Sequence, residues 1–129
     1  MVSDKLDREF DLEDRLIDFA VEAIKLAESF PKSYAGNHLG GQLIRSTTSA
    51  ALNYGEAQSA ESRKDFIHKI KIVLKELRES RICLRILKRI QSRNSLIKII
   101  PILNECNELI SIFVASISTA EGKMRGKKT

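Results

Sequence analysis

Apolar and polar residues between positions 39 and 90 recur with the period of an α-helix. In the first half of this stretch a polar set runs beside an apolar one at spacings of three and four: Gln42, Ser46, Ser49, Asn53 and Glu56. After a short break comes a longer apolar stripe: Phe66, Ile70, Val73, Leu77, Leu84 and Leu87. Residues spaced in this way stay on one face of a helix. The pattern predicts helices over residues 38–59 and 62–92 that pack against each other, with Asn37 and Ser62 as N-caps.

Two further helices are predicted on either side of this pair. The first covers residues 11–29 and ends at Pro31, because a proline disfavours helical geometry in the residue before it. The last begins between Ser95 and Pro101, since proline fits a first helical turn, and ends at Gly122. Its apolar stripe is long and regular: Ile102, Leu103, Cys106, Leu109, Ile110, Phe113, Val114 and Ile117.

Four helices joined by short loops predict an all-α, antiparallel up-and-down four-helix bundle over residues 1–122. Residues 123–129 contain four Lys or Arg and no acid, which predicts a disordered basic tail. The pair Gly40–Gly41 falls near the start of a helix and follows no strand, so it does not fit a phosphate-binding loop. Close helix packing or fraying of the helix start is the expectation there.

A second set of residues links the two central helices by polar side chains. Its members are Arg45, Ser46, Ser49, Asn53, Glu56, Asp65, Lys69, Glu76 and Glu79. They could form a catalytic or ligand site, but the favoured interpretation is a structural polar network, since buried ions must be paired. We expect Arg45 to pair with a carboxylate among Glu56, Glu76 and Glu79. For a buried pair, Glu76→Ala would cost about 3–5 kcal/mol of stability.

No grouping of residues predicts catalysis, and no catalytic residue, metal site or cofactor is expected. The two histidines, His38 and His68, fall in different helices without partners spaced for a triad or a metal. Glu105 and Glu108 lack the Glu-x-x-His pattern of di-iron bundles. Two cysteines without a CxxC motif predict buried, reduced thiols.

Charge is distributed unevenly along a chain whose net charge is +5. Residues 1–30 have nine acids and four bases, whereas residues 62–93 have eleven bases and three acids. One face of the third predicted helix gathers the residues expected to bind nucleic acid: Lys64, Lys71, Lys75, Arg78, Arg85 and Arg89. Aromatic residues make up only 5% of the chain, which favours backbone or shape recognition of a structured RNA or a duplex over base stacking. A merely solvated helix face is the competing interpretation.

The same charges permit a different function, that of an assembly or adaptor protein. The acidic first helix of one subunit could meet the basic third helix of another, using both charges in a homo-oligomer interface. Ile82 and Ile86 interrupt the basic face and suggest a further contact surface. The N-terminus shows no apolar signal segment and no stretch reaches the length of an apolar membrane span, so we expect no membrane association and a cytoplasmic location.

The polar and apolar pattern of the two central helices resembles the four helix bundle protein family, encoded within intervening sequences of bacterial 23S ribosomal RNA genes. The matching segments are LGGQLIRSTTSAALNYGEA at 39–57, SRKDFIHK at 62–69 and KELRE at 75–79. The resemblance spans about residues 10–118. Cys83 departs from the family pattern, in which an aromatic residue is frequent.

The resemblance implies an antiparallel four-helix bundle that assembles into a ring-shaped homopentamer in the bacterial cytoplasm. A related branch acts as an accessory protein of diversity-generating retroelements and engages nucleic acid and a reverse transcriptase through a basic surface. No catalytic residue is implied, because the family has none established. The alternative to direct nucleic-acid binding is therefore a ring that binds another protein, such as a reverse transcriptase.

Overall fold

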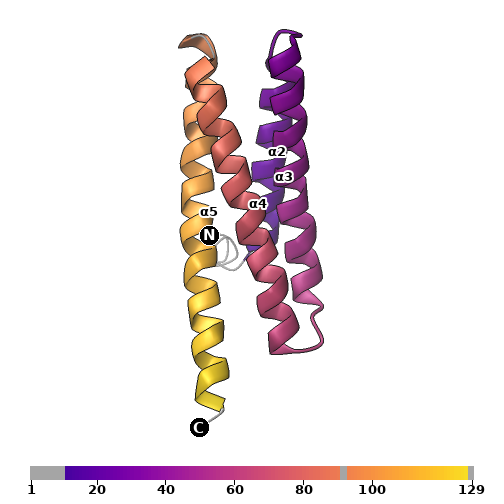
Figure 1. Ribbon diagram of the computed structural model, residues 1–129, viewed down its shortest axis with the longest axis vertical. Coiled ribbons are helices and arrows are strands. Elements are labelled where there is room, and N and C mark those ends of the chain that lie inside the picture. Colours follow the sequence, from indigo (N-terminus) through magenta and orange to yellow (C-terminus); the bar gives the residue numbers. More distant parts are fainter. Residues whose placement is uncertain (1–10, 91–92, 128–129) are drawn as a thin grey trace, which may run out of the picture.

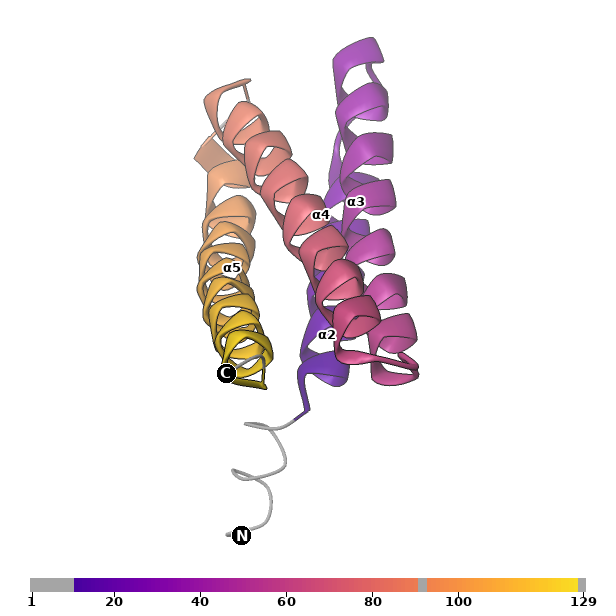
Figure 2. The same cartoon turned by 60° about the horizontal axis from the view of Figure 1, so that its bottom comes forward.

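Four long helices form an antiparallel bundle in the computed structural model, which describes residues 11–90 and 93–127 (Figure 1). The helices are α2 (Leu12–Ser29), α3 (Tyr34–Gln58), α4 (Arg63–Ile90) and α5 (Arg93–Lys127). Each packs along its neighbour in sequence (Figure 2), while α2 and α5 meet over a smaller contact that closes the bundle. The predicted all-α, up-and-down four-helix bundle is confirmed.

Side-chain caps determine where the first three helices begin. Asp11 accepts a hydrogen bond from the Asp14 amide, and Ser62 accepts one from the Asp65 amide, each at 3.0 Å. The predicted N-cap at Ser62 is therefore confirmed. The predicted start of α3 at residue 38 is wrong, because Ser33 accepts from the Gly36 amide and the helix begins at Tyr34. The apolar stripe starts only at Leu39, so periodicity gave no sign of this first turn.

Both predicted ends of the last helix are wrong. α5 begins at Arg93 and contains Pro101 in its interior, on the exposed side of the helix. A proline there removes only one helical hydrogen bond, and the buried neighbours Ile99 and Ile102 hold the segment against the bundle. At the other end α5 passes through Gly122 and continues to Lys127.

Contacts with α4 explain why α5 continues beyond Gly122. Glu121 forms an ion pair with Lys71 at 3.1 Å, and Met124 faces Ile67 across a small cavity. Residues 123–127, predicted to belong to a disordered tail, are therefore helical. The last two residues of that predicted tail, and residues 91–92 of the predicted third helix, lie outside the described residues.

A single apolar core extends through the whole bundle. Its largest completely buried side chains include Phe113, Leu16, Leu43 and Leu77. Tyr54 packs edge-to-face on Phe113, with ring centroids 5.6 Å apart. The predicted apolar stripe of α5 is buried except at Leu103, which is partly buried, and at Val114, which is 44% exposed.

The helix α5 is long and apolar enough over residues 93–126 to cross a membrane by length and composition alone. Its most apolar window has a mean hydropathy of 1.3, and a third of that window is buried in the bundle. A core helix satisfies the same criteria.

Candidate functional site

The contact between α3 and α4 contains a forked ion pair. Arg45 of α3 lies 3.0 Å from Glu76 and 2.7 Å from Glu79, both on α4. The Glu76 side chain is only 5% exposed, whereas Arg45 is 52% exposed. The hydrogen bond to Glu79 and the charge of Glu76 raise the pKa of the guanidinium. The arrangement fixes the register of the two helices, because the carboxylates are one helical turn apart.

Beside this ion pair the two helices approach through serines. The hydroxyl oxygens of Ser46 on α3 and Ser80 on α4 lie 2.7 Å apart, and both residues are buried. Ser80 also donates to the Glu76 carbonyl at 2.9 Å. Ser80 was not predicted from the sequence, although a serine four residues after Glu76 falls on the same helical face. The small side chains allow the two backbones to pack closely.

The remaining residues of the predicted polar network form separate contacts. Lys69 lies 2.8 Å from Glu56, and Asn53 donates to both the carbonyl and the hydroxyl of Ser49 within α3. Asp65 takes part through its backbone amide at the cap of α4. Over residues 11–90 and 93–127, every buried side-chain nitrogen or oxygen has a hydrogen-bond partner. The structure therefore brings these residues together as helix-to-helix and local pairs.

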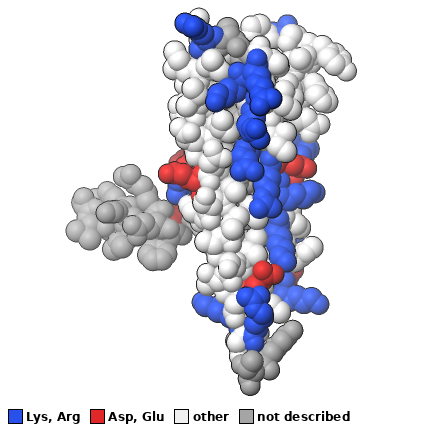
Figure 3. Space-filling model, turned by 60° about the vertical axis from the view of Figure 1, so that its left-hand side comes forward, with Lys and Arg blue, Asp and Glu red and all other residues white. Residues whose placement is uncertain are grey.

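The six basic residues proposed to bind nucleic acid are all exposed on one side of α4. They are Lys64, Lys71, Lys75, Arg78, Arg85 and Arg89. Lys71 pairs with Glu121, and the other five form no ion pair with any described residue. Figure 3 shows a nearly continuous column of Lys and Arg along this side of the molecule, interrupted by few acids. We call this surface the basic face.

Two of the three acids of α4 form ion pairs with a residue of α3. Glu76 and Glu79 are engaged by Arg45 of α3. The bases of α4 outnumber its three acids, and among these bases Lys69 is paired with Glu56 of α3. This excess of positive charge produces a positive field on the exposed side of α4.

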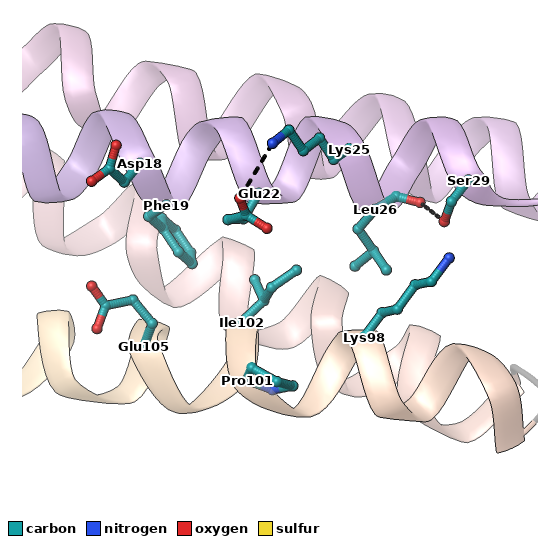
Figure 4. A pocket seen from close by; sticks show the side chains of 10 residues that line it. All are labelled: Asp18, Phe19, Glu22, Lys25, Leu26, Ser29, Lys98, Pro101, Ile102 and Glu105. Carbon is teal, nitrogen blue, oxygen red and sulfur yellow. Dashed lines mark hydrogen bonds and ion pairs between the residues drawn. The ribbon is translucent and has the colours of Figure 1, made fainter.

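An apolar groove opens on the other side of the molecule, between α2 and α5. Phe19 and Leu26 of α2 face Ile102 of α5 across it, and its volume is about 510 Å³ (Figure 4). Glu105, which lines the groove, accepts two hydrogen bonds of 2.8 Å from Arg15 of α2. Sequence analysis had considered Glu105 only as a metal ligand, so this connection was not foreseen.

Groups suited to catalysis are dispersed in the described part of the chain. No cluster of three His, Cys, Asp or Glu side chains within it has the spacing of a metal site. Both thiols are free and buried, which confirms their prediction as buried reduced cysteines. Burial raises the pKa of Cys83 to about 11 and that of Cys106 to about 12, so neither is a thiolate at neutral pH. Cys83, the departure from the family pattern, donates to the Leu39 carbonyl at 3.2 Å.

Comparison with known proteins places this architecture in a family. A search of curated proteins finds no match. Among solved structures, a protein of unknown function from the S23 ribosomal protein family of Bacteroides thetaiotaomicron is similar, with 30% identity and a TM-score of 0.70. The match covers 81% of this chain and 96% of that one. The model of the 23S rRNA-intervening sequence protein family matches residues 8–115. The chain therefore belongs to the 23S rRNA-intervening sequence protein family.

Proposed function

We propose that this protein is a non-catalytic nucleic-acid-binding bundle whose basic face on α4 contacts the phosphates of a structured RNA. The observation that supports this proposal best is the separation of charge on α4. Five exposed cations have no ion pair with a described residue, while Glu76 and Glu79 are engaged by Arg45. Lys and Arg in such a row bind nucleic acid by displacing condensed counterions from its phosphates.

The preference for RNA rests on two supports. The family is named for sequences that intervene in 23S ribosomal RNA, and this name supports an RNA ligand. The basic face has no exposed aromatic platform, since Phe66 packs against the core and Tyr54 and Phe113 are buried. Binding through the backbone and the shape of a folded RNA suits such a surface.

Assembly into a ring would enlarge this surface. We propose that the protein forms a homopentamer in the bacterial cytoplasm, as its resemblance to this family implies. Exposed isoleucines on α4 support a subunit contact: Ile82 is 55% exposed, Ile86 43% and Ile90 53%. Repetition of the basic face around a ring would add the phosphate contacts of several subunits on one RNA.

The experiment is a titration of a fluorescently labelled RNA hairpin, followed by anisotropy at low salt. Arg78→Glu should weaken binding by about 1–3 kcal/mol if the face contacts phosphates, since a favourable charge becomes a repulsive one. The control is Lys25→Glu, which makes the same change of charge on α2, where the exposed Lys25 lies 3.7 Å from Glu22. Equal weakening by both variants, or no binding by the unmodified protein, would contradict the proposal.

A second candidate function is an assembly or adaptor protein that binds another protein, such as a reverse transcriptase, without contacting nucleic acid. The observation that favours it is the apolar groove between α2 and α5, whose rim includes Asp18, Glu22 and Lys98. Protein binding through such a groove would persist at high salt, because burial of apolar surface is weakly screened. Salt-resistant protein binding combined with no affinity for RNA would favour this function.

A further inference from the structure

A second cavity lies between α4 and α5, at one edge of the basic face. Its volume is about 530 Å³, within the range of sites that hold small ligands. The α4 side supplies the cations Arg81, Arg85, Lys88 and Arg89, and the α5 side includes Leu103 and Asn107. None of the residues that line this α4–α5 cleft is acidic.

The cations of the cleft are available to a ligand. Arg81, Arg85 and Lys88 recur at spacings of four and three, so successive turns of α4 each present a cation to the cleft. None of the four forms a side-chain hydrogen bond or ion pair with residues 11–90 or 93–127. Arg81 is nevertheless half-buried, so its side chain forms part of the wall of the cleft and does not move freely in solvent.

The cleft combines three chemical features that one ligand would satisfy together. Guanidinium groups bind phosphate in a bidentate manner, and their flat faces stack on nucleic-acid bases. The half-buried Leu103 offers an apolar surface for a base or a sugar. The Asn107 amide is both a donor and an acceptor, as the edge of a base requires.

We propose that the α4–α5 cleft holds an unpaired nucleotide of single-stranded RNA, with its phosphates on the α4 cations and its base against Leu103 and Asn107. This inference rests on the nucleic-acid binding proposed above and adds a site to it. In a duplex the bases are paired and stacked inside, so only the phosphates would reach the cleft. In a loop or bulge the base is free to turn outward and enter. The arginine planes then replace the aromatic rings that usually stack such bases.

The test compares a single-stranded RNA oligonucleotide with the same strand paired to its complement. Asn107→Glu places a negative charge in the cleft, and Asn104→Glu makes the identical change at an exposed position of α5 that does not line it. We expect Asn107→Glu to weaken single-strand binding about tenfold, as loss of one base contact does. Its effect on duplex binding should equal that of Asn104→Glu.

A second matched pair removes a charge from inside and outside the cleft. Arg85→Ala should weaken single-strand binding more than Arg78→Ala, whereas the two should affect the duplex equally, since both residues belong to the basic face. Circular dichroism verifies that all four variants keep the helical fold. Equal effects within each pair on the single strand would overturn the cleft site while leaving phosphate binding intact. Absence of binding to either RNA at low salt would overturn the proposed function itself.

Discussion

The carboxylate of Glu76 on α4 is almost completely buried, yet the Arg45 guanidinium that lies 3.0 Å away is half exposed. The two partners therefore depend on each other to different degrees. Without Arg45, the carboxylate would be left unpaired in a poorly solvated place. Without Glu76, the guanidinium would still have solvent and Glu79, at 2.7 Å.

This asymmetry predicts unequal effects of removing each partner. Arg45→Met should lower the free energy of unfolding by about 3 kcal/mol, because it leaves a buried charge unpaired. Glu76→Gln should cost about 1 kcal/mol, since the amide remains able to hydrogen-bond. The sequence alone predicted a larger loss of about 3–5 kcal/mol for Glu76→Ala, because both partners of the ion pair were assumed to be buried. Urea denaturation measures both values, and equal losses would refute the asymmetry.

The same ion pair predicts a loss of stability in acid. A hydrogen bond with the Glu76 carboxyl group and another from the Arg45 guanidinium lower the pKa of Glu79 below its ordinary value of 4.5. A carboxyl with a lowered folded pKa contributes stability that is present above pH 4.5 and lost as the pH falls through the folded pKa. The Glu79→Gln variant should therefore lose less stability on acidification than the unmodified protein. The control, Glu28→Gln, removes an exposed carboxyl without an ion pair in the described residues and should leave the acid profile unchanged.

Two adjacent glycines in α3 provide a matched test of packing. A Cβ at Gly40 would lie 3.2 Å from the Cβ of Ala27 on α2, whereas a Cβ at Gly41 would meet no atom within 4 Å. Gly41→Ala should stabilise the protein by about 0.5–1 kcal/mol, because alanine favours a helix over glycine. Gly40→Ala gains the same preference but crowds Ala27, so it should be the less stable variant. If the melting temperature of Gly40→Ala equals or exceeds that of Gly41→Ala, α2 can move away from the added methyl group without loss of stability.

The two thiols should react only when the bundle opens. Cys106 is completely buried and donates to the Leu77 carbonyl at 3.3 Å, and Cys83 is 6% exposed. Because burial raises both pKa values to about 11 or 12, a disulfide reagent at neutral pH should modify neither thiol quickly in the folded protein. Both should react at once in denaturant. Rapid reaction of one thiol in the absence of denaturant would reveal local opening of its helix.

The fold was predictable from sequence because its main signals are periodic. The polar stripe beside the apolar one between residues 39 and 79 predicted that α3 and α4 pack together, and Arg45 lies beside two of the three carboxylates expected for it. Helix ends were less predictable. Ser33 lies before the apolar stripe begins, and the residues beyond Gly122 remain helical through contacts with α4 that sequence spacing does not encode.

The candidate site was predictable only in part. The exposure of Lys75 and Arg78 could be predicted from their angular positions on the helix, since both lie opposite the apolar stripe. Arg81 and Lys88 were missed, because their role depends on how α5 lies beside α4 and forms a cleft with them. A cavity between two helices is a property of their packing, and no spacing within one helix reveals it.

The most direct test of the central claim is the salt dependence of RNA binding. The logarithm of the association constant should fall linearly with the logarithm of salt concentration, by about 0.9 per phosphate contact for a duplex. The double variant Lys75→Glu, Arg78→Glu should show a shallower slope with unchanged assembly by size-exclusion chromatography. Its control, Lys25→Glu with Lys32→Glu, makes the same total change of charge at exposed residues outside α4 and should keep the original slope. An identical slope for all three proteins would contradict phosphate binding by the basic face.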